Sequence, residues 1–371
     1  MKILLVGNYP YLKSQSMDRF ATMLHEGLRL RGHDVRLLKP QPFLGRLRPS
    51  PTGLGKWLGY WDRFVLFRPM LRRATEWADV VHICDQANAV YVPWLKGKPH
   101  VVTCHDMLAV RSALGEISDH PTGLTGRIYQ RWILSGLKKA MRVVCVSQTT
   151  REDLLRITGL LPEKVSVVRN GLNYPYRPLP EQEIAGHLEK MGLADNRSFF
   201  LHVGGDFWYK NKPGLLKIFA DTVRPDTEKK HRLVLVGGGI SSSLRDLAAD
   251  LGVAERIKAV GAIGNEALCA LYATAEGLIF PSLAEGFGWP IIEAQACGCP
   301  VFTSNRKPMN EIGGNGAVYF DPEDSTGAAQ IILSALKDRA SLVQNGFKNI
   351  ENYTTKAMLS GYIAEYRRVL R

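Results

Sequence analysis

Short apolar runs alternate with segments of helical period along the whole chain. Near the N-terminus an apolar run at 2–6 is followed by apolar residues at helical spacing from about 17 to 31 and by a second run at 35–38. The alternation returns from 198 to about 322, after a stretch from 172 to 183 that is rich in proline and tyrosine. Strand–helix–strand order predicts parallel sheets. We therefore expect an α/β protein of two parallel-sheet domains that are joined by a linker and face each other across a cleft.

Length and composition restrict the class of protein further. The 371 residues are enough for two domains of ordinary size. The six cysteines form no C-x-x-C pair, which favours free thiols and a cytoplasmic location. No apolar run approaches the length of a transmembrane helix, and the N-terminus has the pattern of a strand rather than of a secretory signal. The net charge of +13 favours an anionic partner: nucleic acid, a membrane surface or a phosphorylated substrate.

One predicted strand, loop and helix has the pattern of an anion site. The apolar run at 277–280 leads into a loop with Gly286 and Gly288, and Pro290 lies near the start of the following apolar segment. Proline is tolerated in the first turn of a helix, where backbone N–H groups lack partners and attract phosphate. The sequence therefore predicts a phosphate-binding helix start.

Two glutamates flank this helix start. Glu285 precedes it in the loop, and Glu293 follows it within the first turns. Carboxylates repel phosphate but accept two hydrogen bonds from a vicinal diol, and a nucleotide sugar carries a ribose and a hexose on the two sides of its diphosphate. The alternative is that both are solvated charges beside a structural glycine turn.

A histidine and an aspartate end another apolar run. His105 and Asp106 follow the run at 100–104, at the carboxyl end of a predicted parallel strand, where open α/β sheets bind ligands. A histidine at the end of a strand is also a common structural residue, so its position alone leaves both interpretations open.

Three runs together resemble the signature of the retaining glycosyltransferases of family 4, which adopt the GT-B fold. These runs are E-G-F-G-W-P-I-I-E from 285, V-V-T-C-H-D-M from 101 and W-Y-K-N-K-P-G-L-L from 208. The resemblance implies two Rossmann-like domains: residues 1–178 as an acceptor domain and 179–353 as a nucleotide-sugar donor domain. It also implies that a final helix, 354–371, packs back on the first domain.

The resemblance assigns a role to each matched residue. Glu285 would contact the donor sugar, Glu293 the nucleotide ribose and Lys210 the diphosphate, while His105 and Asp106 would face the donor sugar and the acceptor. The candidate catalytic residues are His105, Asp106, Lys210 and Glu285. The candidate donor-binding residues are Lys210, Asn211, Lys212, Ile263, Gly286, Phe287, Gly288, Trp289 and Glu293.

The chain departs from the family pattern in two places. Tyr209 stands where relatives often carry arginine, so Lys212 is the candidate for a second positive charge. The frequent Gly-Gly after the first strand is replaced by the run from Tyr9 to Met17. No Asp-x-Asp follows a strand, and no group of His, Cys, Asp or Glu has metal-ligand spacing in the sequence. We therefore expect no metal site and no resident cofactor, with the nucleotide sugar as co-substrate.

Residues 43–73 mix aromatic side chains with cations. Trp57, Trp61 and Phe64 fall at helical spacing among lysines and arginines. Three interpretations stay open: packing in the protein interior, contact with an anionic membrane or a lipid-linked acceptor, and contact with nucleic acid. Nucleic acid ranks behind the other two, so we expect none as a partner.

The resemblance, together with the absence of a metal-ligand pattern, implies a retaining, metal-independent glycosyltransferase. It would move a hexose from a nucleotide-diphosphate sugar to a hydroxyl of a glycan or lipid-linked glycan, for cell-surface polysaccharide biosynthesis, in the cytoplasm or at the inner membrane face. The alternatives are a GT-B phosphorylase or other sugar-nucleotide-processing enzyme, and a non-catalytic basic module that binds a membrane or nucleic acid.

Overall fold

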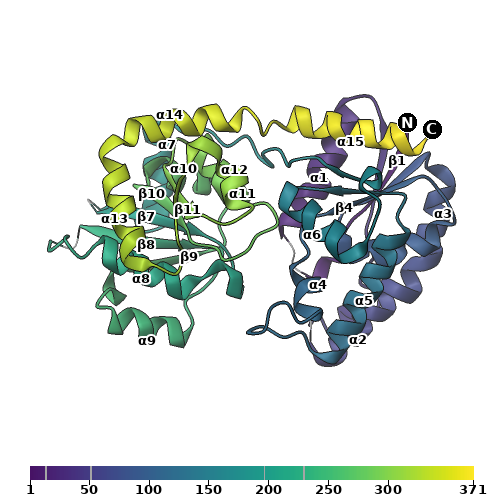
Figure 1. Cartoon of the computed structure of the whole chain (residues 1–371), viewed down its shortest axis with the longest axis horizontal. Helices are drawn as coiled ribbons and strands as arrows, with labels where there is room; N and C mark the ends of the chain where they lie inside the picture. Colours follow the sequence, from purple (N-terminus) through teal and green to yellow (C-terminus); the bar gives the residue numbers. More distant parts are fainter. Residues whose placement is uncertain (13–14, 51, 196, 229) are drawn as a thin grey trace. The chain divides into compact units, whose positions relative to one another are not determined.

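The computed structural model describes residues 1–12, 15–50, 52–195, 197–228 and 230–371. The chain divides into two compact units (Figure 1). Unit 1 contains Met1–Asn173 together with Thr355–Arg371, and unit 2 contains Tyr174–Thr354. The division therefore falls after Asn173, within the proline- and tyrosine-rich stretch. The boundary suggested from the sequence lay five residues later, after 178.

Unit 1 is built on a six-stranded parallel sheet with the order β2-β1-β3-β4-β5-β6. Its strands are β1 (Lys2–Val6), β2 (Asp34–Leu38), β3 (Val80–Ile83), β4 (His100–Cys104), β5 (Arg142–Cys145) and β6 (Val165–Val167). Its α-helices are α1 (Gln15–Leu30), α2 (Gly53–Trp61), α3 (Phe67–Trp77), α4 (Leu108–Ala113), α5 (Leu124–Lys139), α6 (Gln148–Thr158) and α15 (Thr355–Val369). A π-helical turn, Asp62–Leu66, joins α2 to α3.

Unit 2 repeats this architecture with the strand order β12-β11-β10-β7-β8-β9. Its strands are β7 (Ser198–Val203), β8 (His231–Val236), β9 (Ile257–Gly261), β10 (Gly277–Phe280), β11 (Val301–Ser304) and β12 (Val318–Phe320). Its α-helices are α7 (Glu181–Lys190), α8 (Lys212–Thr222), α9 (Ser242–Asp250), α10 (Asn265–Thr274), α11 (Trp289–Ala296), α12 (Met309–Gly313), α13 (Ser325–Ala335) and α14 (Arg339–Ile350).

The central strands form because they are short, apolar and buried on both faces, as parallel sheets require. Every residue of β3, β4 and β10 is buried. Each pair of neighbouring strands is parallel, so all six carboxyl ends of a sheet point the same way. The loops that leave these ends therefore gather at one edge, and this edge holds the candidate residues of each unit.

The last helix belongs to unit 1. In α15, Tyr366 Oη lies 2.7 Å from Nδ1 of buried His82. Glu365 of the same helix forms an ion pair with Arg142 of β5. The C-terminal segment thus packs against the first half of the chain through buried polar contacts as well as apolar ones.

Candidate active site

The strand, loop and helix around β10 and α11 form as the sequence predicted. Gly288, the residue before α11, has a φ of 96°, a left-handed conformation that glycine adopts without strain. Pro290 lies in the first turn of α11. Phe287 and Trp289 are buried, with ring centroids 6.1 Å apart. The aromatic side chains thus pack at the start of the helix, where the Ile291 N–H donates to the Gly288 carbonyl oxygen at 3.0 Å.

Lys210 and Glu285 form an ion pair at this edge. Lys210 Nζ lies 2.7 Å from Glu285 Oε1, and the two side chains are only 12% and 10% exposed. Nζ also lies 4.7 Å from the centroid of the Phe280 ring. A charge pair that is shielded from water interacts more strongly than one at the surface. The structure therefore joins two residues that lie 75 positions apart and that the sequence assigned to one site.

Asn211 joins the loops that carry this pair. Its φ is 52°, and its Oδ1 accepts a hydrogen bond from Gly214 N at the start of α8 (3.1 Å). Its Nδ2 donates to the carbonyl oxygens of Pro281 and Pro322, each at 3.2 Å. Asn211 therefore connects the segments that follow β7, β10 and β12, and it holds Lys210 close to Glu285.

Lys212 points to a different partner. Its side chain is buried, and Nζ contacts the Asp206 carboxylate and the Gly239 carbonyl oxygen, the latter at 3.1 Å. The ammonium group thus links the loops after β7 and β8. The second charge that the sequence expected here is present and already engaged by an aspartate.

Glu293 is buried in α11. Its Oε2 accepts a hydrogen bond from Tyr272 Oη of α10 at 3.1 Å. Burial and the nearby Glu293 charge raise the pKa of Tyr272 well above its usual value, so the phenol stays protonated and donates. Ile263 is half-buried in the loop between β9 and α10. The sequence indicated Glu293 but not Tyr272. The apolar sequence of α10 contains no local pattern that identifies its tyrosine as the hydrogen-bond partner of Glu293.

His202 is a polar residue of β7 to which the sequence assigned no role. Its Nδ1 lies 3.0 Å from the Ile279 carbonyl oxygen, and among the described residues its Nε2 has no hydrogen-bond partner. Complete burial lowers the pKa of His202 to about 3, so the ring is neutral. A Cβ at Gly204 would lie 3.2 Å from both His202 Nε2 and Lys210 Cδ. Glycine at 204 therefore lets the backbone pass beside the lysine.

In unit 1, His105 follows β4 and is buried. Its Nε2 lies 2.8 Å from the Cys84 carbonyl oxygen, and its backbone N–H donates to Gln86 Oε1 at 2.8 Å. The ring of Phe20 meets it edge to face, with centroids 4.7 Å apart. Burial lowers the pKa of His105, which favours the neutral ring. Because Nε2 must then carry the proton that the carbonyl accepts, Nδ1 is left as an acceptor.

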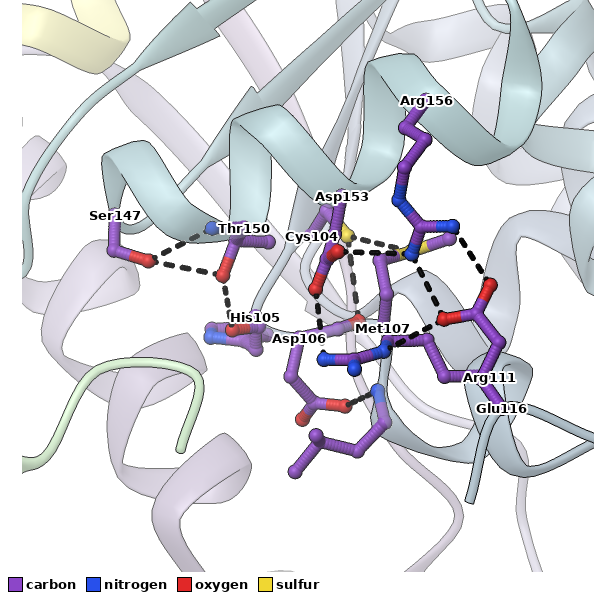
Figure 2. Close-up of polar contacts among 11 residues, drawn as sticks. Cys104, His105, Asp106, Met107, Arg111, Glu116, Ser147, Thr150, Asp153 and Arg156 are labelled. Carbon is purple, nitrogen blue, oxygen red and sulfur yellow. Dashed lines mark hydrogen bonds and ion pairs between the residues drawn. The ribbon is translucent and has the colours of Figure 1, made fainter. Parts of the chain in front are cut away.

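Asp106 organises the start of α4. Its Oδ1 accepts a hydrogen bond from Leu108 N at 2.9 Å (Figure 2). Four charged residues hold α4 against α6 through ion pairs of 2.7–3.2 Å: Arg111, Glu116, Asp153 and Arg156. The segment that carries His105 and Asp106 is therefore held by the hydrogen bond between Asp106 and Leu108 and by the ion pairs that join α4 to α6.

A buried polar cluster lies beside His105 and was missed from the sequence. Asn8 Nδ2 donates to Asp85 Oδ2 at 2.6 Å, and Asn88 Nδ2 donates to Asn8 Oδ1 at 2.5 Å. Asp85 Oδ1 also accepts from Ala87 N at 2.8 Å. The loops after β1 and β3 are joined in this way. Of the run from Tyr9 to Met17 that replaces the glycine pair, Lys13 and Ser14 lie outside the described residues.

The search for metal and membrane-spanning features covered only the described ranges. Within them, no three side chains of His, Cys, Asp or Glu are placed to hold one metal ion. None of the helices found there combines the length and the apolar character needed to cross a bilayer.

Two doubly wound domains with the candidate residues at the carboxyl edges of their sheets define a GT-B protein, and solved structures agree. Sucrose-phosphate synthase from Thermosynechococcus elongatus superposes with a TM-score of 0.75 at 20% identity, covering 99% of this chain and 98% of that one. HepE from Anabaena, in complex with UDP and glucose, superposes with a TM-score of 0.74 at 18% identity, covering 98% of each chain.

The chain belongs to glycosyltransferase family 4. The model "Glycosyltransferase Family 4" matches residues 17–174, and the model "Glycosyl transferases group 1" matches 186–353. O-antigen chain mannosyltransferase RfbU from Salmonella typhimurium is 26% identical over 66% of this chain and 66% of its own length. D-inositol 3-phosphate glycosyltransferase from Rhodococcus jostii is 28% identical over 74% of this chain and 63% of its own length. The matches thus span less than two thirds of these relatives.

Proposed function

We propose that this chain is a retaining, metal-independent glycosyltransferase. It moves a hexose from a nucleotide-diphosphate sugar to a hydroxyl of a glycan or lipid-linked glycan, in the synthesis of a cell-surface polysaccharide. Family membership supports glycosyl transfer. The names of relatives such as the O-antigen mannosyltransferase support a hexose and a surface glycan, and the UDP and glucose in the HepE structure support a nucleotide sugar.

The buried ion pair of Lys210 and Glu285 carries this proposal. When the bond between the anomeric carbon and the diphosphate breaks, the diphosphate takes the electron pair and gains negative charge. A cation that is already positioned stabilises that charge at little reorganisation cost. Lys210 supplies the cation, and its partner Glu285 lies in the loop that leads into α11. In the absence of substrate Glu285 balances its charge, and an arriving diphosphate would replace the carboxylate as the partner of Lys210.

The other candidate residues then take roles that suit their protonation and contacts. Glu285, released from Lys210, accepts hydrogen bonds from donor-sugar hydroxyls, and Glu293 accepts from the ribose. Neutral His105 accepts a sugar hydroxyl at Nδ1, and Asp106 orients the acceptor. We assign the residues of unit 1 because 101–107 resembles the family motif and because the hydrogen bond to Cys84 leaves Nδ1 of His105 as an acceptor.

The proposed reaction balances without a protein nucleophile. The acceptor oxygen attacks the anomeric carbon from the face that the diphosphate leaves, the carbon–oxygen bond to phosphate breaks, and a phosphate oxygen receives the acceptor proton. The new bond therefore keeps the anomeric configuration. Metal independence is proposed because Lys210 and the start of α11 can provide the stabilisation that a divalent cation provides elsewhere.

The first experiment identifies the donor. Thermal unfolding is measured with UDP, GDP, dTDP and ADP, each with Mg²⁺ and with a chelator, on the natural chain and on Glu293→Ala. We expect one diphosphate to raise the unfolding temperature equally with and without Mg²⁺, and to lose this effect in the variant. If no nucleotide stabilises the natural chain, the assignment of a donor site is wrong.

We also propose that the protein works in the cytoplasm, at the inner membrane face. Residues 43–73 would contact anionic lipid, because they contain exposed aromatic side chains among many cations.

A further inference from the structure

The helical segment from 53 to 66 has two different faces, so the alternatives of packing and surface contact apply to different residues. Tyr60 and Phe64 point inward, where the Phe64 ring lies 6.0 Å from that of Tyr129 in α5. Trp57 and Trp61 point outward and are 54% and 55% exposed. Large side chains left in water at helical spacing indicate a binding face rather than a core.

The segment packs side by side with α5, and the two run in the same direction. Three contacts advance together along both helices. Lys56 Nζ lies 3.1 Å from Thr125 Oγ1, the Tyr60 and Tyr129 rings lie 6.2 Å apart, and the Phe64 and Trp132 rings lie 4.7 Å apart. Figure 1 likewise draws α2 and α5 as neighbours within unit 1.

This arrangement brings the exposed apolar residues of the two helices to one side. On the first helix they follow the contact residues by one position: Trp57 follows Lys56, and Trp61 follows Tyr60. On α5 they precede them: Leu124 precedes Thr125, and Ile128 precedes Tyr129. One residue turns a helix by about 100°. Two parallel helices contact each other through opposite faces. A step of one residue forward from the contact on the first helix and one residue backward on the second therefore brings both side chains to the same side of the pair. The exposed residues on this side form what we call the two-helix surface: Leu54, Trp57, Trp61, Val65, Leu124 and Ile128.

The surroundings of the two-helix surface are cationic. The sequences of α2 and α5 contain no acidic residue. The only acid within 43–73 is Asp62, which is buried and accepts hydrogen bonds from Tyr9 Oη (2.7 Å) and from Leu44 N and Gly45 N (2.8 Å each). Among the described residues of 43–73 and of α5, the exposed charged side chains are all basic: Arg46, Arg48, Arg68, Arg72, Arg73, Arg127, Arg131, Lys138 and Lys139.

We propose that the two-helix surface lies flat on an anionic phospholipid bilayer, with its apolar side chains at headgroup depth and the arginines against lipid phosphate. This deepens the membrane contact proposed above, because it adds α5, which lies outside 43–73, and excludes the inward half of that segment. Exposed tryptophan and leucine, together with exposed arginines on the same and the adjoining segments, suit a bilayer. A second copy would bring the same positive charge and repel, and nucleic acid would require cations at the centre.

The test measures sedimentation of the full chain with vesicles. One set contains phosphatidylcholine alone, and the other an equimolar mixture with phosphatidylglycerol, each at low and high salt. We expect binding to the anionic vesicles that weakens with salt. Leu124→Ser, on α5, should weaken binding by about fivefold, and Trp57→Ser with Trp61→Ser by more than about tenfold, because apolar burial and charge both contribute to interfacial binding. Leu30→Ser is the matched control, because Leu30 is as exposed (88%) as Leu124 (79%) and lies on α1.

Each other outcome overturns the proposal. Equal binding to neutral and anionic vesicles would show that the arginines do not contribute to binding. Unchanged binding of Leu124→Ser would show that α5 is not part of the contact. A Trp-dependent self-association without vesicle binding would identify a second copy as the occupant, and salt-sensitive binding to DNA instead of vesicles would identify nucleic acid. Vesicle binding requires no donor and no turnover, so these results are independent of the nucleotide titration that tests the proposed function. Unchanged circular dichroism of each variant shows that it folds.

Discussion

At the carboxyl edge of the sheet in unit 2, the buried polar contact that connects two loops is an ion pair, Lys210 with Glu285. At the corresponding edge in unit 1, two loops are connected through an amide and a carboxylate, Asn8 with Asp85, and a neutral histidine lies next to them. The two units share a topology but differ in the charge that they place at this edge. A cation is placed in the unit proposed to bind the diphosphate, and hydrogen-bonding groups are placed in the unit proposed to bind sugar and acceptor.

The ion pairs that follow Asp106 in unit 1 are more exposed than the Lys210–Glu285 pair, and this difference matters for their strength. Arg111, Glu116, Asp153 and Arg156 have side chains 22–52% exposed, compared with about a tenth for Lys210 and Glu285. Solvent and salt screen exposed pairs, whereas a buried pair retains its interaction. We therefore expect the buried pair to determine activity and the exposed network to affect stability only slightly.

Removing the buried cation should have the largest effect. We expect Lys210→Met to lower kcat about 100-fold, since the loss of one positioned group that stabilises developing charge has that size. Lys217→Met is the matched control, because Lys217 is an exposed lysine on α8 of the same unit. Steady-state turnover of the nucleotide sugar measures both. Equal turnover in the two variants would contradict the role of Lys210.

Glu293→Gln should weaken nucleotide binding about tenfold and change kcat less. The amide keeps the shape of the side chain and one acceptor oxygen, but it loses the charge-assisted hydrogen bonds to the ribose. Calorimetric titration with the stabilising diphosphate gives the dissociation constant. Glu255→Gln, at an exposed position of the same unit, should bind as the natural chain does. A kcat effect without a binding effect would assign Glu293 to the reacting sugar instead.

Lowering the pH should destabilise both units to a similar extent, although the two units carry different charges at the carboxyl edges of their sheets. His82 in unit 1 and His202 in unit 2 are fully buried, and burial lowers the pKa of each to about 3. The unfolded chain takes up these protons below about pH 6.5 and the folded chain does not, so stability is full above that pH and falls as the pH decreases. Each histidine should cost about 1 kcal/mol between about pH 6.5 and 5.5. Denaturant unfolding at the two pH values measures the change; equal stabilities would show that the folded state protonates them.

The fold, and the strand, loop and helix start that carry the candidate donor residues, could be predicted because local patterns specify them. The apolar run at 277–280, the glycines around Phe287 and Pro290 together define a strand, a loop and a helix start without any distant contact. The contacts that arrange the site could not be predicted in this way. Asn8 with Asp85 and Tyr272 with Glu293 are each joined only by the register of the sheets and the packing of helices.

The segment at 43–73 shows the same limit in another form. Its composition indicated two environments, packing in the interior and contact at the surface. Helical spacing alone could not show which aromatic rings face the interior and which face solvent. The contact of Phe64 with Trp132 decides this, because it fixes the inward face, and α5 lies about 70 residues farther along the chain. A partner helix at that distance leaves no local signal in the sequence.

The smallest effect is expected from the exposed network that follows Asp106. Arg156→Gln removes contacts with Glu116 and Asp153, while Arg111 continues to pair with both acids. Such pairs contribute about 0–1 kcal/mol each and weaken in salt. We therefore expect a loss of roughly half a kcal/mol at low salt that disappears at high salt, with kcat unchanged. Denaturant unfolding at two salt concentrations measures it. A loss of activity at constant stability would mean that the network positions Asp106 for the reaction, and that the charge pairs of unit 1 serve catalysis as those of unit 2 are proposed to do.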